Sequence, residues 1–341
     1  MNYLLKAQQK LVPEMTILLQ KRYKILMTIQ LSGEIGRRAL SDLVQMTERE
    51  TRKETEALKQ QGLVNIRSVG MEITEEGKDV LHTLKDLVHE WSGFSQMEHQ
   101  IQQAFNISRV IIVPGDSEVD HQAKSLLGQM AAKQIDYLTE PKQIVAVTGG
   151  STIASIADYL SVYVKQKDLT FLAARGGIGE EVQLQANTIA ASFAKETNGM
   201  YRTLYLPDHL SEEAYVAMMK EPVIKEMLHL YDQTSVVIHG IGDALEMAKR
   251  RSSSDDEIHT IQQAGAVGEA FGYYFNKDGQ AVHRIRTVGI QLKQLESVQH
   301  LIAVAGGASK SAPIGSYLRH APIQTVLITD EGAARKLSQQ L

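Results

Sequence analysis

The chain has 341 residues, 43% of them hydrophobic, which is enough for two or three domains with their own cores. It has no cysteine, no apolar run of about 18 residues and no apolar signal core, so we expect a cytoplasmic protein without disulfides, thiolate metal sites or a membrane span. The net charge of −4 is uneven: residues 1–85 hold 14 Lys and Arg against 11 acidic residues, and the rest hold 22 against 29. A basic N-terminal part on an acidic body favours a nucleic-acid partner.

The first third of the chain reads as helices followed by a hairpin. Residues 1–31 predict one long helix or two, broken before Pro13. A short helix at 34–44 and a turn at 45–47 follow, and then a helix at 48–60, for which Thr47 and Glu50 form a capping box. The segments 63–66 and 70–74 predict a small hairpin.

This order predicts a winged helix-turn-helix, whose second helix enters the major groove of DNA. We expect Arg49, Arg52 and Lys53 on that helix to reach base edges, and Arg37 and Arg38 on the helix before it to meet phosphates. The alternative is a charged, solvated helix face, and the acidic residues on the same helix argue against a general polyanion binder.

A further helix at 80–88 leads to a joint at 91–95 and to another helix at 97–105. We therefore expect a DNA-binding domain at 1–88 and a second domain at 89–341. From Arg109 onwards, strands and helices alternate, which predicts a mainly parallel, Rossmann-like α/β sheet covered by helices. The predicted strands are 110–113, 144–148, 169–173, 202–206, 236–238, 287–290, 301–305 and 325–328, and the predicted helices are 122–138, 153–164, 185–197, 212–228 and 314–318.

Four predicted strands end in glycine-rich segments, at 149–152, 175–179, 240–243 and 306–310. In a parallel sheet these ends meet at one edge, where ligands bind. Arg175 and Lys310 add fixed positive charge, so we expect an anionic ligand there. The segment Gly149, Gly150, Ser151, Thr152 lies between a strand and a helix and suits a phosphate, the alternative being an ordinary turn with a serine cap.

With these residues in view, the chain resembles the SorC-type sugar-responsive transcriptional regulators. The resemblance covers the whole chain and rests on the winged unit and on the segments 148–152, 175–177 and 306–310. It implies an effector domain related to sugar-phosphate isomerases and deaminases, and repression of glycolytic genes relieved by fructose 1,6-bisphosphate. It also implies the ligand residues, which are Gly149, Gly150, Ser151, Thr152, Arg175, Gln185, Arg250, Arg251, Glu269 and Lys310.

In this interpretation the 149–152 turn and Lys310 hold one phosphate, the pair Arg250 and Arg251 reaches the other, and Gln185 and Glu269 bind sugar hydroxyls. The arginine pair is equally well explained as a solvated surface pair, and Glu269 as a surface acid or a relic of a catalytic base. We expect no cofactor, metal or catalytic residue, and a dimer or tetramer on repeated DNA half-sites. The competing interpretation is a sugar-phosphate isomerase or deaminase with an extra domain, in which Glu269 or Asp243 moves protons.

Overall fold

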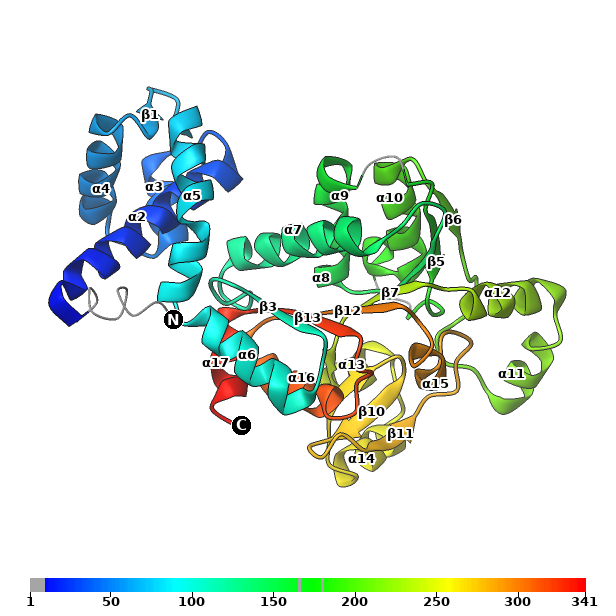
Figure 1. Cartoon of the computed structure of the whole chain (residues 1–341). Coiled ribbons are helices and arrows are strands. Elements are labelled where there is room, and N and C mark those ends of the chain that lie inside the picture. The colour runs from blue at the N-terminus through cyan, green and yellow to red at the C-terminus, as the bar shows by residue number, and fades with distance from the viewer. Residues whose placement is uncertain (1–9, 165–166, 179–180) are drawn as a thin grey trace. The chain divides into compact units, whose positions relative to one another are not determined.

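The computed structural model describes residues 10–164, 167–178 and 181–341, which fall into two compact units, Met1–Gln96 and Met97–Leu341 (Figure 1). Leu4 and Leu5 of the predicted first helix, and Gly179 of the predicted 175–179 segment, lie outside these residues. Each unit has its own hydrophobic core.

The N-terminal unit is a helical bundle with a two-stranded hairpin. Its elements are α2 (Pro13–Ser32), α3 (Arg37–Val44), α4 (Glu48–Gln60), β1 (Val64–Ile66), β2 (Met71–Ile73) and α5 (Glu75–Trp91). Pro13 begins α2, as expected for a residue that lacks an N–H donor. The capping box of Thr47 and Glu50 is present at the start of α4. The predicted helix order, turn and hairpin are therefore confirmed.

The second unit is built on seven parallel strands in the order β3-β13-β12-β7-β4-β5-β6. Their bounds are β3 (Arg109–Val113), β4 (Ile144–Val147), β5 (Thr170–Ala173), β6 (Met200–Arg202), β7 (Val236–His239), β12 (His300–Val304) and β13 (Thr325–Asp330). Side chains of the central strands are buried on both faces, which explains their continuous apolar runs.

Helices cover both faces of this sheet (Figure 1). One face carries α7 (His121–Leu138), α9 (Ala157–Tyr163) and α10 (Ala186–Thr197), and the other α6 (Phe94–Phe105), α16 (Ser311–Leu318) and α17 (Glu331–Ser338). The shorter helices are α8 (Ser151–Ala154), α11 (Glu212–Met218), α12 (Pro222–Asp232), α13 (Ala244–Arg250), α14 (Asp255–Gln263) and α15 (Leu292–Leu295), with single 3₁₀ turns at Val182–Leu184 and Ala308–Lys310.

A second, antiparallel sheet was not predicted from the sequence. It has the order β11-β10-β9-β8 and contains β8 (Gly242–Asp243), β9 (Ala266–Ala270), β10 (Tyr273–Asn276) and β11 (Ala281–Arg284). Phe271 and Gly272 form the two-residue turn between β9 and β10, both with positive φ, at 56° and 80°. A turn of this kind normally carries asparagine or glycine at its first position, so phenylalanine there hides the hairpin in the sequence.

Two predicted strands are wrong. The segment 287–290 is a loop with buried apolar residues, and its β-pairing is a single bridge between Gly289 and Arg175. The strand placed at 202–206 is β6 instead, because Asn198 ends α10 in the left-handed conformation and the chain pairs from Met200 onwards. The helix predicted at 153–164 is divided into α8 and α9.

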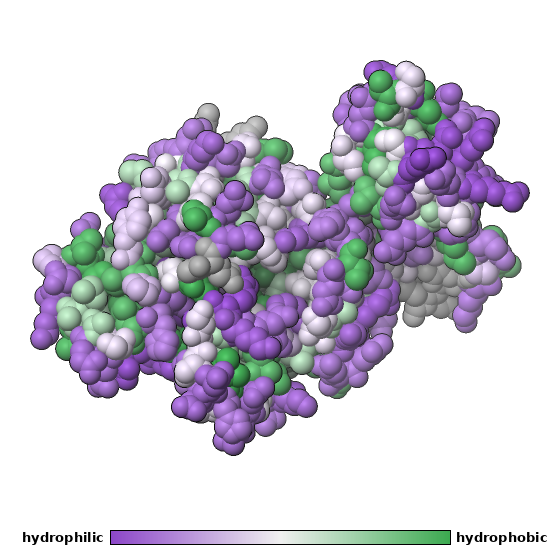
Figure 2. All heavy atoms as spheres, turned by 180° about the vertical axis from the view of Figure 1, so that it is seen from behind, coloured by the Kyte–Doolittle hydropathy of each residue, from purple (hydrophilic) through white to green (hydrophobic). Residues whose placement is uncertain are grey.

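No helix within the described ranges is long and apolar enough to cross a membrane. On the face shown in Figure 2, polar side chains surround separate apolar patches. The large hydrophobic core of each unit therefore lies inside that unit. Polar groups lie near the strand ends of the second unit.

Candidate functional site

A cavity opens at the carboxyl ends of β4, β5, β7 and β12, within the second unit. The cavity is lined by the residues predicted from the sequence to bind the ligand, together with other residues at the same strand ends. The candidates are Gly149, Gly150, Ser151, Thr152, Arg175, Gln185, Arg250, Arg251, Glu269 and Lys310. The fold thus brings ten residues, spread over more than 160 positions of sequence, around one cavity.

The turn after β4 presents open backbone donors to the cavity. Gly150 has a φ of 119°, a conformation that side chains rarely adopt, and its N–H donates to the carbonyl of Leu184 at 2.8 Å. Gly149 is required for a different reason, because a Cβ there would lie 2.7 Å from the same carbonyl. Helix α8 begins at Ser151 without a side-chain cap. In the described part of the chain, the N–H groups of Ser151 and Thr152 have no acceptor, which suits an anion.

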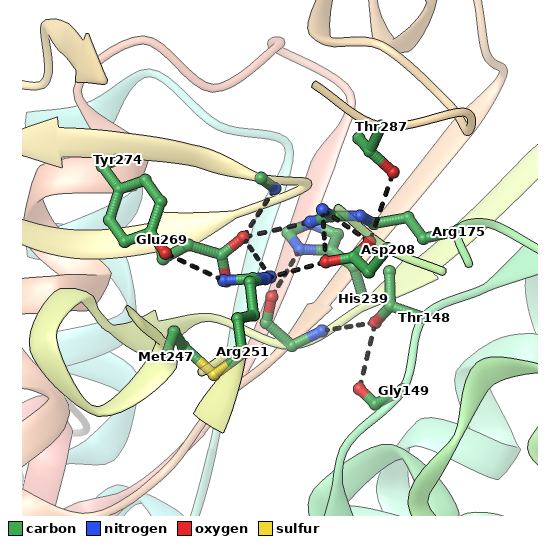
Figure 3. Close-up of polar contacts among 12 residues, drawn as sticks. Thr148, Gly149, Arg175, Asp208, His239, Met247, Arg251, Glu269, Tyr274 and Thr287 are labelled. Carbon is green, nitrogen blue, oxygen red and sulfur yellow. Dashed lines mark hydrogen bonds and ion pairs between the residues drawn. The ribbon is translucent and has the colours of Figure 1, made fainter. Parts of the chain in front are cut away.

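Four buried charges form the wall of the cavity opposite this turn (Figure 3). We call Arg175, Asp208, Arg251 and Glu269 the charged cluster. Asp208 accepts hydrogen bonds from Nη2 of Arg175 at 2.9 Å and from Nε of Arg251 at 2.8 Å. Glu269 Oε1 accepts from Nη1 of Arg175 at 3.1 Å and from Nη2 of Arg251 at 2.9 Å. Each arginine therefore pairs with both carboxylates.

The charged cluster joins the two sheets. Arg175 directly follows β5 and Asp208 lies between β6 and α11, whereas Arg251 follows α13 and Glu269 lies on β9 of the antiparallel sheet. None of the four side chains is more than 7% exposed. Two positive and two negative charges cancel, which is the condition under which buried ions are tolerated.

Burial alone would raise the pKa of Asp208, but the two arginines outweigh it and hold this pKa below its ordinary value. Burial acts to lower the pKa of Arg251, and the carboxylates of Glu269 and Asp208 reverse the effect, so its pKa is raised. Asp208 and Arg251 are therefore both ionised at neutral pH. The Nε of Arg175 is buried and has no hydrogen-bond partner in the part of the chain that the structure describes, which leaves one donor for a ligand.

Arg250 and Arg251, which the sequence predicts to act as a pair, lie in different environments. Arg251 is buried in the charged cluster and also donates to the hydroxyl of Tyr274 at 3.2 Å. Arg250, at the end of α13, is exposed and lines the cavity. The interpretation of both residues as a solvated surface pair is therefore wrong for Arg251. The charge of Arg251 is compensated by Asp208 and Glu269.

The two acids proposed for proton transfer are both engaged in structural contacts. Glu269 is 4% exposed, so it is not a surface acid, and its Oε1 accepts a third hydrogen bond from the N–H of Gly272 at 2.6 Å. Asp243 caps α13 by accepting from the N–H groups of Leu245 and Glu246 at 2.9 and 3.0 Å. Neither carboxylate is arranged as a general base.

The glycine-rich turn after β12 is filled by the protein's own carboxylates. Asp330 accepts from the N–H of Gly307 at 2.6 Å, Asp116 from that of Ala308 at 3.3 Å and Glu118 from that of Ser309 at 3.0 Å. The Ser309 bonds lower the pKa of Glu118. These amides are not available to a phosphate, and the turn instead supports Lys310, whose side chain lines the cavity.

Behind the cavity, His239 is completely buried at the end of β7. Its Nδ1 lies 2.9 Å from the carbonyl of Gly240 and its Nε2 lies 3.1 Å from the hydroxyl of Tyr317, so we assign the proton to Nδ1. Burial lowers the pKa of His239 to about 4. The ring is therefore neutral at pH 7 and adds no charge to the site.

In the N-terminal unit, Arg49, Arg52 and Lys53 are exposed on the first two turns of α4. The opposite side of α4 is anchored by buried Glu54, which pairs with Arg22 of α2 at 2.8 Å. On α3, Arg38 is exposed and lies 3.4 Å from Glu48, and Arg37 is half-buried. The three basic residues of α4 thus face solvent together, as DNA contact requires.

Sequence reasoning missed Asp208, one of the two carboxylates that bind both arginines. The residue lies in a loop, 33 residues from Arg175 and 43 from Arg251, and no motif marks it. The only signal was its position shortly after a predicted strand. Met247 and Phe271 also line the cavity, and both come from elements around the unpredicted sheet.

Comparisons with known proteins agree with this organisation. The family model "Putative sugar-binding domain" matches residues 89–338, and the model "CggR N-terminal DNA binding domain" matches residues 18–88. The Central glycolytic genes regulator of Priestia megaterium is 44% identical over 338 residues, covering 99% of this chain and 98% of that protein. The protein of the same name from Bacillus subtilis is 43% identical over 337 residues, covering 99% of each.

Among solved structures, the crystal structure of "the putative SorC family transcriptional regulator from Enterococcus faecalis" is 42% identical, with a TM-score of 0.67. The match covers 71% of this chain and 99% of the Enterococcus faecalis chain. The DNA-binding domain and the relatives, which are named as transcriptional regulators, indicate a regulator and not an enzyme. The chain therefore belongs to the SorC family of transcriptional regulators and, within it, to the central glycolytic genes regulators.

Proposed function

We propose that this protein is a repressor of glycolytic genes that binds operator DNA and is released by a phosphosugar, fructose 1,6-bisphosphate. Residues 1–88 act as the DNA-binding domain, and residues 89–341 bind the effector and hold two or four copies together. The observation that carries the proposal is the cavity at the strand ends, with open backbone donors on one side and two cationic side chains, Lys310 and Arg250, at its walls.

The distribution of charge favours a ligand with two phosphates. Arg175 and Arg251 pair with carboxylates within the charged cluster. Lys310 and Arg250 also line the cavity, and in this proposal they supply the positive charge that phosphates need. The donors of the 149–152 turn and Lys310 bind one phosphate, and Arg250 binds the other. Gln185 and Glu269 also line the cavity, and in this proposal they bind sugar hydroxyls.

Replacing Lys310 by alanine tests the ligand site. We expect Lys310→Ala to weaken binding of fructose 1,6-bisphosphate by about 1.5–3 kcal/mol, because it removes a charge-assisted hydrogen bond to phosphate. Lys249→Ala is the matched control, since Lys249 is an exposed lysine on α13 that does not line the cavity. Titration calorimetry on the full chain measures both. An unchanged affinity in Lys310→Ala would refute the phosphate position.

The DNA side of the proposal is tested with one residue from each helix of the pair. We expect Arg52→Ala to weaken operator binding more than binding to random DNA, because Arg52 lies where α4 reaches base edges. We expect Arg38→Ala to weaken both by a similar factor and to lower the salt dependence, as loss of a phosphate contact does. Fluorescence anisotropy at several salt concentrations separates the two. Equal losses on operator and random DNA in both variants would contradict these roles.

A further inference from the structure

An ion pair lies at the edge of the effector cavity. Nζ of Lys310 is 3.4 Å from Oε2 of Glu246. Lys310 belongs to the wall formed by β12, whereas Glu246 stands on α13, next to the cavity residues Met247 and Arg250. The Lys310 side chain is 26% exposed and that of Glu246 is 67% exposed. The Glu246 carboxylate is therefore paired with the Lys310 ammonium group, which binds a phosphate in the proposed function.

Both partners of this ion pair are held in place by their backbones. The cap that Asp243 provides fixes the first turn of α13, including the N–H of Glu246 itself. On the other side, Asp330, Asp116 and Glu118 bind three successive N–H groups immediately before Lys310. The contact thus joins two elements whose backbones are anchored.

We propose that Glu246 competes with the effector for Lys310 and so sets the effector concentration at which the regulator responds. The proposal rests on the proposed function, because it requires an effector phosphate at Lys310. A phosphate that takes Lys310 has to displace the Glu246 carboxylate. Glu246 is then a residue that weakens binding in the native chain, in contrast to the residues that line the cavity.

Removing the competing charge should tighten binding. We expect Glu246→Gln to raise the affinity for fructose 1,6-bisphosphate about 2- to 5-fold, since exposed ion pairs of this kind are worth at most about 1 kcal/mol. The exchange is nearly isosteric and the residue is exposed, so the fold is retained. Glu226→Gln, an exposed glutamate on α12 outside the cavity, removes the same charge elsewhere and should leave the affinity unchanged.

Titration calorimetry with fructose 1,6-bisphosphate on the full chain tests the proposal, using Glu246→Gln, Lys310→Ala and the double variant. In the Lys310→Ala background, Glu246→Gln should no longer change the affinity, because its effect acts through Lys310. In the otherwise native chain the gain should shrink as salt is raised, since it is electrostatic.

The outcomes separate this proposal from the one on which it rests. If Lys310→Ala binds as tightly as the native chain, the phosphate position is wrong and the proposed function fails at this site. If Lys310→Ala weakens binding but Glu246→Gln leaves it unchanged or weaker, competition by Glu246 is refuted. A gain that persists in the double variant also refutes it, because Glu246 would then act independently of Lys310.

Discussion

Saturating fructose 1,6-bisphosphate is expected to lower the affinity for operator DNA about 5- to 150-fold, the effect of a coupling free energy of about 1–3 kcal/mol. The cavity lies in the unit Met97–Leu341 and the recognition helix in the unit Met1–Gln96, so each site is made by one unit alone. An effector can act on DNA binding only through a different affinity for two arrangements of the protein. Anisotropy with labelled operator at fixed salt measures the change.

The coupling must be reciprocal. Operator DNA should weaken effector binding by the same factor, because both numbers describe one thermodynamic cycle. In Lys310→Ala a higher effector concentration should be needed for the same release, which ties the effect to the cavity. Random DNA serves as the control. Identical effector affinity with and without operator would show that the ligand has a structural role, and the regulatory part of the proposal would be wrong.

Asp208→Asn is expected to cost about 3–5 kcal/mol of unfolding free energy, the usual loss when one partner of a buried ion network is removed. The amide leaves Arg175 and Arg251 with only Glu269 as a counter-charge, and a net positive charge stays buried. Calorimetric unfolding of the full chain should show a lower transition temperature for the effector unit. The unfolding transition of the DNA-binding unit, where it is separate in temperature from that of the second unit, serves as an internal reference.

The matched control is Asp158→Asn on the exposed first turn of α9, where we expect the free energy of unfolding to change by at most about 1 kcal/mol.

The sign of the pH dependence follows from the lowered pKa of Asp208. Its stabilisation is complete above the ordinary aspartate pKa of 3.8 and is lost as the pH falls through the lower native value. The difference between native chain and Asp208→Asn should therefore narrow in acid. Equal stabilities at pH 7 would show that the charged cluster does not hold the two sheets together.

The parts of the fold that are encoded locally could be predicted from the sequence. Thr47 and Glu50 specify the start of α4 by themselves, and the apolar run at 144–147 specifies a buried strand. The antiparallel sheet depends on pairing between β9, β10 and β11, and its turn carries Phe271 in an unusual conformation. Nothing within a short window of sequence signals such pairing.

The same limit applies to the site. The glycine segments at 149–152 and 306–310 look alike in sequence, yet only the first has open amides. The second is filled by Asp116, Glu118 and Asp330, two of which lie more than 190 residues before it. The charged cluster likewise depends on Asp208, whose role appears only once the chain is folded. Glycine patterns predicted segments that line the cavity, and long-range contacts determine which of their amides are bonded within the protein.

Glu269 accepts three hydrogen bonds and Asp243 caps a helix, and these contacts have a consequence for the cell. A protein that turned over its phosphosugar would deplete the pool that it measures, and its response would depend on its own copy number and on elapsed time. Because Asp243 and Oε1 of Glu269 already accept these hydrogen bonds, we expect the effector to leave the cavity chemically unchanged. Under the proposed function, the response would then depend only on the effector concentration at equilibrium and would be reversible.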